Sequence, residues 1–297
     1  MDSIINEISK KELNSESQEI TSILDKGVRN KVFKVSINDV EYIFRINSKD
    51  EIDMYLKEEW CINEARKIEI KTSECLHVGT MDEYSYMILN YIEGTNGDDS
   101  DLNKKDIFKS LGKFAKKFNS VKTNGFGREI SGKDLGFTQT WQEFHDSQMK
   151  YFFNDTIFVD NDVLSIQQLE IIKARLSEMK EWKYKPSLCH GNLGPKNTVV
   201  TPQNEIYVID WGNGAGNIAP HVDLADIIAW KSTRIYLDDF LEGYGMTKEE
   251  FENIEHEVNN ILIIQLIGII KWSIEKGNNF LDKKFIEQSI ERIMVLK

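Results

Sequence analysis

Cysteine is scarce in this sequence, and its three residues show no spacing that would join them. Cys61, Cys75 and Cys189 are scattered along 297 residues, and none of them belongs to a CxxC pair. An odd number of scattered cysteines indicates neither a disulfide framework nor a zinc site, and it is typical of the reducing cytoplasm. We therefore expect a cytoplasmic protein.

Basic charge is in deficit as well. The chain carries 49 acidic residues against 37 basic ones, which gives a net charge of -12. A nucleic-acid surface needs clustered lysine and arginine, so this balance argues against nucleic acid as a partner. It is compatible with a cationic small molecule, although surface acids more often serve solubility.

Long apolar runs are also missing. The most apolar stretch, residues 261–270, is shorter than the roughly 20 residues that a membrane span needs. Residues 1–14 are polar and lack the apolar core of a signal peptide. We therefore expect no membrane partner and interpret 261–270 as part of a buried helix.

Proline is rare, and all of it lies in one window. The four prolines fall between residues 186 and 220, and five of the 18 glycines fall between 191 and 216. Proline and glycine fix loops that regular elements cannot supply, and rigid loops often carry chemistry. Composition alone therefore directs attention to the middle of the chain.

The first third of the chain has the pattern of an antiparallel sheet. Apolar and polar residues alternate at 31–37, and turn signals lie at 27–30 and 38–39. Residues 51–70 contain good helix formers and no glycine or proline. We predict one helix at 51–70 and five strands, at 19–27, 31–39, 41–47, 74–80 and 84–92.

The character changes after residue 100. Apolar residues recur at helical spacing within 106–121, and helices are also predicted at 141–153, at 165–182 and through most of the last 75 residues. The sequence therefore predicts a bilobal α+β fold. A small five-stranded antiparallel lobe spans 1–93, and a larger, mostly helical lobe spans 94–297.

The proline-rich window contains a kinase-like constellation. Protein kinases use H-R-D-x-x-x-x-N for a base and a metal ligand and D-F-G for the second ligand. Here LCHGNLGPKNTVV, residues 188–200, places Asn197 five residues after Asn192, and a predicted hairpin leads to DWG at 210–212. The hairpin folds the chain back, so that Asn197 and Asp210 can face one Mg²⁺ ion. An amide oxygen, a carboxylate, phosphates and water suit that ion.

The predicted small lobe offers the complementary parts. Arg45 lies on the third strand, where kinases carry a cation for the nucleotide phosphates, and Glu58 is preferred over Glu59 as its partner. The turn at 25–30 has a single glycine, so any cover over the phosphates is short. Met87 and Ile88 would line the nucleotide pocket. The backbone of Asn90, Tyr91 and Ile92 would link the lobes and hold a purine edge.

The order of these motifs resembles the aminoglycoside phosphotransferase superfamily of kinase-like small-molecule kinases. The resemblance rests on LCHGNLGPKNTVV, IYVIDWGNGAGNIAPHVDLADI, YIFRIN, KEEWCINEARK, YSYMILNYIEG and LGKFAKKFNSVKTNGFG, which cover most of the chain. It implies transfer of the γ-phosphate of ATP or GTP to a hydroxyl of a small molecule, with an aminoglycoside as one candidate.

The resemblance also implies roles for individual residues. Asn197 and Asp210 would ligate Mg²⁺, and Arg45, held by Glu58, would contact the nucleotide phosphates. His190 would brace the loop, and Asp223 would tie the loop to the next helix. The last position also suits a helix N-cap.

Asn192 departs from the family pattern, which has aspartate as the base that accepts the hydroxyl proton. An amide can accept a hydrogen bond but cannot take up that proton. A general base supplies about 10²–10⁴-fold in rate, whereas positioning and charge neutralisation drive most of phosphoryl transfer. Either the chain is a phosphotransferase, slow or assisted by another acid such as Asp226, or it binds nucleotide or a small molecule without efficient turnover. A third reading is that Asn192 was introduced to trap a complex.

The sequence says little about the substrate. Acids between 238 and 257 could attract a polycation, although solvated helix faces carry such acids more often. Trp211, Trp230 and Trp272 could line the cleft, although helix aromatics are usually core residues. The acids are Asp238, Asp239, Glu242, Glu249, Glu250, Glu252, Glu255 and Glu257.

Overall fold

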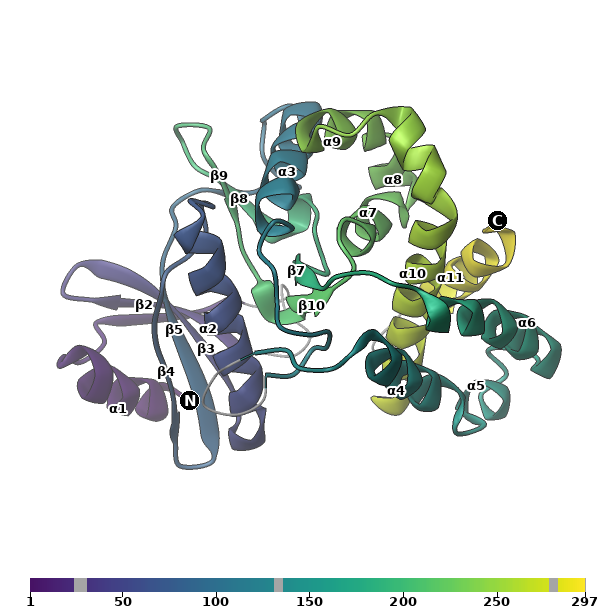
Figure 1. Ribbon diagram of the computed structural model, residues 1–297. Helices are drawn as coiled ribbons and strands as arrows, with labels where there is room; N and C mark the ends of the chain where they lie inside the picture. Colours follow the sequence, from purple (N-terminus) through teal and green to yellow (C-terminus); the bar gives the residue numbers. More distant parts are fainter. Residues whose placement is uncertain (24–30, 131–135, 278–282, 297) are drawn as a thin grey trace.

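The protein folds into a small lobe, built on one sheet, and a helical large lobe (Figure 1). The computed structural model describes residues 1–23, 31–130, 136–277 and 283–296. The sheet is antiparallel, in the order β1-β2-β3-β5-β4, which confirms the predicted α+β class. Its strands are β1 Glu19–Ser22, β2 Lys31–Ile37, β3 Val40–Ser48, β4 Cys75–Met81 and β5 Tyr84–Asn90. The expected turns at 25–30 lie outside the described residues.

Side-chain alternation sets the register of the sheet. In β2, Phe33, Val35 and Ile37 are buried, while the residues between them are partly exposed. A slip of one residue would turn these three side chains to the other face and expose them. The apolar pattern therefore fixes β2 against β3, where Val35 pairs with Tyr42.

A helix that the sequence patterns did not reveal covers one face of the sheet. Helix α1, Asp2–Leu13, inserts Ile5 and Ile8 into an apolar cluster with Phe33, Phe44 and other strand residues. Only two fully buried apolar side chains lie among polar neighbours, so the amphipathic signal of this segment is weak. Figure 1 shows α1 on the side of the sheet away from α2.

Helix α2, Ile52–Lys67, covers the opposite face, where Ile62 and Ala65 share a cluster with Met87. This arrangement corrects one prediction. Met87 and Ile88 cannot line one pocket together, because successive strand residues point to opposite faces. Met87 packs in the cluster on the α2 side, whereas Ile88 packs in the α1 cluster.

Capping motifs start several helices of the large lobe. Thr140 opens α4 and Thr247 opens α10, each by a reciprocal hydrogen-bonded box with a glutamate three residues on. The predicted helix at 165–182 is shorter than expected, since α6 ends at Ser177 and a 3₁₀ turn follows. The helices are α3 Lys104–Phe118, α4 Trp141–Phe153, α5 Ile157–Asp160, α6 Ile166–Ser177, α7 His221–Ile228, α8 Lys231–Arg234, α9 Leu237–Tyr244, α10 Lys248–Glu275 and α11 Lys283–Val295.

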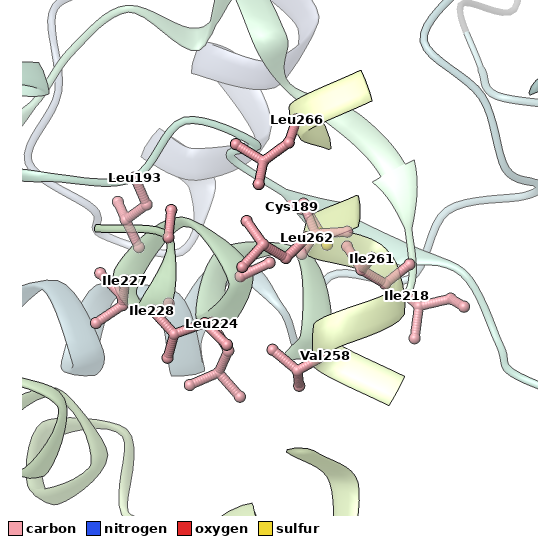
Figure 2. Close-up of a cluster of buried hydrophobic side chains, with 14 of the residues drawn as sticks. Cys189, Leu193, Ile218, Leu224, Ile227, Ile228, Val258, Ile261, Leu262 and Leu266 are labelled. Atoms are coloured by element: carbon pink, nitrogen blue, oxygen red, sulfur yellow. The ribbon is translucent and has the colours of Figure 1, made fainter. Parts of the chain in front are cut away.

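Figure 2 shows the apolar core that lies among the 190–197 loop, α7 and α10. Leu193 of the loop, Ile227 of α7 and Leu262 of α10 belong to one buried cluster. Each such side chain contributes about 1.5–3 kcal/mol when it is fully buried. This core anchors the loop from below and leaves its polar groups available to the site.

Helix α10 is long and apolar enough to meet the length and composition test for a membrane span. Its best window has a mean hydropathy of 1.3, but 61% of that window is buried inside the protein. Ile263, Leu266, Ile267 and Ile270 are at most 1% exposed. The helix therefore serves as a core element of the large lobe, as expected for residues 261–270.

Candidate active site

Short strands present the two candidate metal ligands. The 190–197 loop follows β7, Ser187–Cys189, and the hairpin of β8, Thr198–Val200, and β9, Ile206–Val208, leads to Asp210. The hairpin was predicted, whereas β6, Thr95–Asn96, and β10, Ala215–Asn217, which pair with β8 and β7, were not. Ile209 N donates to Asn197 O at 2.9 Å, so the hairpin brings the two ligand positions together.

Gly191 is required by the path of the loop. Its φ angle is 71°, and an added Cβ would lie 2.6 Å from the carbonyl oxygen of Asn213. A residue with a side chain would therefore meet both backbone strain and a steric clash. Asp210 also has a left-handed backbone, with φ of 62°, which turns the chain out of the hairpin. Aspartate tolerates this region better than most residues do.

Arg45 joins the small lobe to the hairpin. It forms an ion pair with Glu58, and its Nη2 lies 3.5 Å from Asp210 Oδ1. Glu59 does not take this place, and the ion pair of Arg45 with α2 found among the described residues is the one with Glu58. Burial raises the pKa of Glu58, and the positive charge of Arg45 opposes that shift. Burial would lower the pKa of Arg45, but the charges of Glu58 and Asp210 outweigh it and raise that pKa. Three charged groups from distant parts of the sequence therefore meet at one point.

Asn197 holds the loop in shape with only part of its amide. Its Nδ2 donates to the carbonyl oxygen of Asn192 at 2.7 Å, and its Oδ1 has no hydrogen-bond partner among the described residues. Asp210 keeps 47% of its side chain exposed. An amide oxygen and a carboxylate left available in this way fit the oxygen ligands that Mg²⁺ prefers.

Asp223 fastens the loop to α7. It is fully buried and accepts hydrogen bonds from His190 N at 2.9 Å, from Gly191 N at 3.2 Å and from Asn119 Nδ2 at 2.9 Å. Burial raises the pKa of Asp223 to about 6 despite these donors. Asn119 also donates to Leu188 O, and no sequence pattern singled it out.

His190 lies beneath the loop against Trp211 and Phe118, with the ring of Trp211 4.7 Å away. Its Nε2 lies 3.1 Å from the carbonyl oxygen of Ile209. Burial lowers the pKa of His190 to about 4, so the ring is neutral near physiological pH. A neutral ring at this position joins the loop to the end of the hairpin.

This burial predicts a pH-dependent stability. The unfolded chain binds a proton at His190 below about pH 6.5, while the folded chain does so only near its lowered pKa. The free energy of unfolding should therefore fall by about 2 kcal/mol from this group between about pH 7 and about pH 5. Urea denaturation of wild type and His190→Gln at both values checks it. Equal pH dependence in the two proteins would contradict the prediction. Both proteins share the other titrating groups, such as Asp223, so the difference between them isolates the contribution of His190.

The expected linker has one free stretch of backbone. Asn90 exchanges hydrogen bonds with Glu74, and Tyr91 N donates to Glu41 O at 3.3 Å. Among the described residues, no hydrogen bond engages the backbone of Ile92. Of the three predicted positions, Ile92 is thus the one whose polar groups remain available to a ligand.

Sequence reasoning missed Lys57 as a residue of the site and left Trp211 open between the cleft and the core. Lys57 is 5% exposed, and its Nζ donates to Gly212 O at 2.6 Å. Trp211 is fully buried, and its Nε1 donates to Thr72 Oγ1 at 3.0 Å. The spacing of Lys57 with Cys61 four residues later, on the buried face of α2, was the signal for a buried lysine.

Several of the acids considered for a cationic cleft have partners in the protein. Glu242 pairs with Lys109 on α3, and Glu255 lies 3.1 Å from Arg234. Glu250 caps α10, and Glu257 accepts from Tyr184 OH at 2.6 Å and lies 3.1 Å from His221. These contacts are typical of charged helix faces and leave fewer free acids than the sequence suggested. The ring of Trp230, between α7 and α8, lies 5.0 Å from that of Phe285 and packs against the core.

A sheet lobe tied by an arginine–glutamate pair to an aspartate on a hairpin is the architecture of kinase-like phosphotransferases. The chain belongs to the phosphotransferase enzyme family, whose model matches residues 21–255. This result confirms the family that the sequence motifs indicated. No curated protein sequence matches the chain significantly.

Solved structures share the fold along the whole chain. The aminoglycoside phosphotransferase APH(4)-Ia, as a thermostable mutant with ADP and hygromycin B, has a TM-score of 0.74 and 15% identity, covering 98% of this chain and 97% of that one. Spectinomycin phosphotransferase APH(9)-Ia, with ADP and spectinomycin, has a TM-score of 0.63 and 17% identity, covering 99% of this chain and 94% of that one. APH(2")-IIa, in its complex with gentamicin, has a TM-score of 0.67 and 18% identity, covering 100% of this chain and 97% of that one. At these identities the likeness establishes the fold.

Proposed function

We propose that this protein transfers the γ-phosphate of ATP to a hydroxyl of a small molecule in the cytoplasm. The observation that carries the proposal is the meeting of Arg45, Glu58 and Asp210, which come from the two lobes. A buried cation facing a half-exposed carboxylate provides opposite charges for a phosphate chain and its metal. Solved relatives in fold bind ADP together with hygromycin B or spectinomycin, which supports a nucleotide and a hydroxylated acceptor.

The residues present fit a magnesium ion. Asp210 and the free Oδ1 of Asn197 would hold it, and when bound it would neutralise charge on the phosphates. Arg45 orients the nucleotide phosphates, and Glu58 keeps the guanidinium in place. The free backbone of Ile92, with Asn90 and Tyr91 beside it, offers polar groups for a purine edge.

A second candidate function is binding without efficient turnover. Asn192 favours it, since an amide cannot accept the hydroxyl proton. In this case nucleotide would still bind, because Arg45, Asn197 and Asp210 are retained.

Calorimetric titration with ATP and with GTP, each with and without Mg²⁺, tests the shared part of both functions. We expect Mg²⁺-dependent binding of ATP. Phosphate transfer to hygromycin B, spectinomycin and gentamicin, followed by mass spectrometry, then separates the two. A phosphorylated product supports the kinase, binding without product or hydrolysis supports the second function, and absence of nucleotide binding contradicts both.

A further inference from the structure

Asp226, on the second turn of α7, contacts the residue that follows the HGN segment (residues 190–192). Its Oδ2 accepts a hydrogen bond from Leu193 N at 2.8 Å. That N–H belongs to the peptide that joins Asn192 to Leu193, and Asn197 Nδ2 bonds the carbonyl oxygen of the same peptide. One peptide plane is therefore held by Asp226 on one side and by a proposed metal ligand on the other. The carboxylate therefore contacts the peptide that directly follows Asn192, the position that lacks a base.

Asp226 differs from Asp223, one turn earlier, in how many further hydrogen bonds its carboxylate can accept. Asp223 is fully buried and is engaged by three donors. Asp226 is partly exposed and, within the part of the chain that the structure describes, accepts from two donors, Leu193 N and Gln265 Nε2 at 3.2 Å. An ionised carboxylate offers about four acceptor sites. Asp226 thus retains lone pairs that a third donor can approach.

A small cavity meets Asp226 through its second partner. Gln265 bonds Asp226 with its amide and also lines this cavity of about 20 Å³, whose other polar walls are Arg128, Gln148 and Asn217. A space of this size takes one water or one hydroxyl group of a larger molecule. A hydroxyl group there would lie beside the Gln265 side chain that bonds the carboxylate of Asp226.

We propose that Asp226 is the general base of this protein and replaces the aspartate that is absent at Asn192. The inference rests on the proposed phosphotransfer. The alcohol oxygen attacks the γ-phosphorus, and its proton passes to the carboxylate of Asp226. The bond from the γ-phosphorus to the β–γ bridging oxygen breaks, and its electron pair leaves with ADP. The products are a phosphate ester, ADP and a protonated Asp226, which returns its proton to solvent.

The surroundings of Asp226 suit a base that works near neutral pH. Burial raises the pKa of Asp226 well above its ordinary value, and Asp223 adds to the shift. Lys196 of the loop and Arg128 oppose it, and Gln265 on α10 is neutral. The transfer rate should therefore rise with pH through a range above the usual carboxyl pKa, because only the ionised form accepts the proton.

Four proteins test the assignment: wild type, Asp226→Asn, Asn192→Asp and the double variant. The rates are those of Mg·ATP hydrolysis, with water as acceptor, and of transfer to hygromycin B, spectinomycin and gentamicin. Asp226→Asn should lower the wild-type rate about 10²–10⁴-fold and abolish the rise with pH. The second change, Asn192→Asp, should restore the rate of the Asp226→Asn protein. ATP affinity should stay constant throughout.

Controls separate a chemical role from a structural one. The oxygen of Asp226→Asn can still accept from Leu193 N, and a flipped Gln265 amide can accept from its nitrogen, so its melting temperature should stay close to that of wild type. Glu291→Gln, an exposed acid on α11, should keep the full rate. The assignment would be overturned if Asp226→Asn left the rate unchanged, or if wild type bound Mg·ATP but were inactive in both assays. Neither result would contradict the proposed nucleotide site. Failure of every protein to bind Mg·ATP would overturn it together with the proposed function.

Discussion

Asp210→Asn should lower kcat/KM for phosphate transfer about 10²–10³-fold, the usual loss when one preorganised electrostatic group is removed from an active site. The amide keeps the shape of the side chain but lacks the charge that would hold Mg²⁺. It also removes the charge that faces Arg45 Nη2 at 3.5 Å. Because Asp210 is half-exposed, the fold should tolerate the change.

Calorimetry and product formation check this expectation together. ATP affinity of the variant should lose its dependence on Mg²⁺, while Asp106→Asn, an exposed acid on α3, should behave as wild type does. Retention of full Mg²⁺-dependent binding and transfer by Asp210→Asn would mean that the metal is held elsewhere.

Asp223→Ala should cost about 3–5 kcal/mol of the free energy of unfolding, because each orphaned buried donor costs about 1–3 kcal/mol. The three donors are His190 N, Gly191 N and Asn119 Nδ2, all of which converge on the carboxylate. Truncation removes the acceptor and leaves these three donors without their partner. We expect the loop to loosen before the rest of the protein unfolds.

Urea denaturation compares Asp223→Ala with Asp101→Ala, an exposed acid before α3 that should change stability little. Asp223→Asn should fall between the two, since its amide oxygen still serves the backbone donors while its nitrogen faces the Asn119 nitrogen. A loss below about 1 kcal/mol for Asp223→Ala would show that water replaces the carboxylate.

Sequence patterns anticipated what depends on local spacing. The strands, the hairpin before Asp210 and the pairing of Arg45 with Glu58 follow from alternation and from loop length. Helix α1 was not predicted because only two isoleucines, Ile5 and Ile8, carry its packing. They pack against a face of the sheet that exists only once the chain has folded.

Long-range contacts set the rest of the site. Lys57 meets the backbone oxygen of Gly212, which is 155 residues away, and no local pattern encodes that contact. Asp223 and Asp226 stand one turn apart in one motif, yet burial and donor number distinguish them only in three dimensions. The expected roles of Asn197 and Asp210 as metal ligands stay predictions that the geometry suits.

The packing of Met87 with α2 affects how ligand binding would change the melting temperature and the tryptophan fluorescence of the protein. Met87 and Ile62 belong to the same apolar cluster as Leu262 and Trp211 of the large lobe, so the inner face of the sheet and the helical core are continuous. Parts that share one core tend to melt in a single cooperative transition. Nucleotide bound near Arg45 should then raise one melting temperature for the whole molecule, and tryptophan fluorescence from the large lobe would register an event at the sheet.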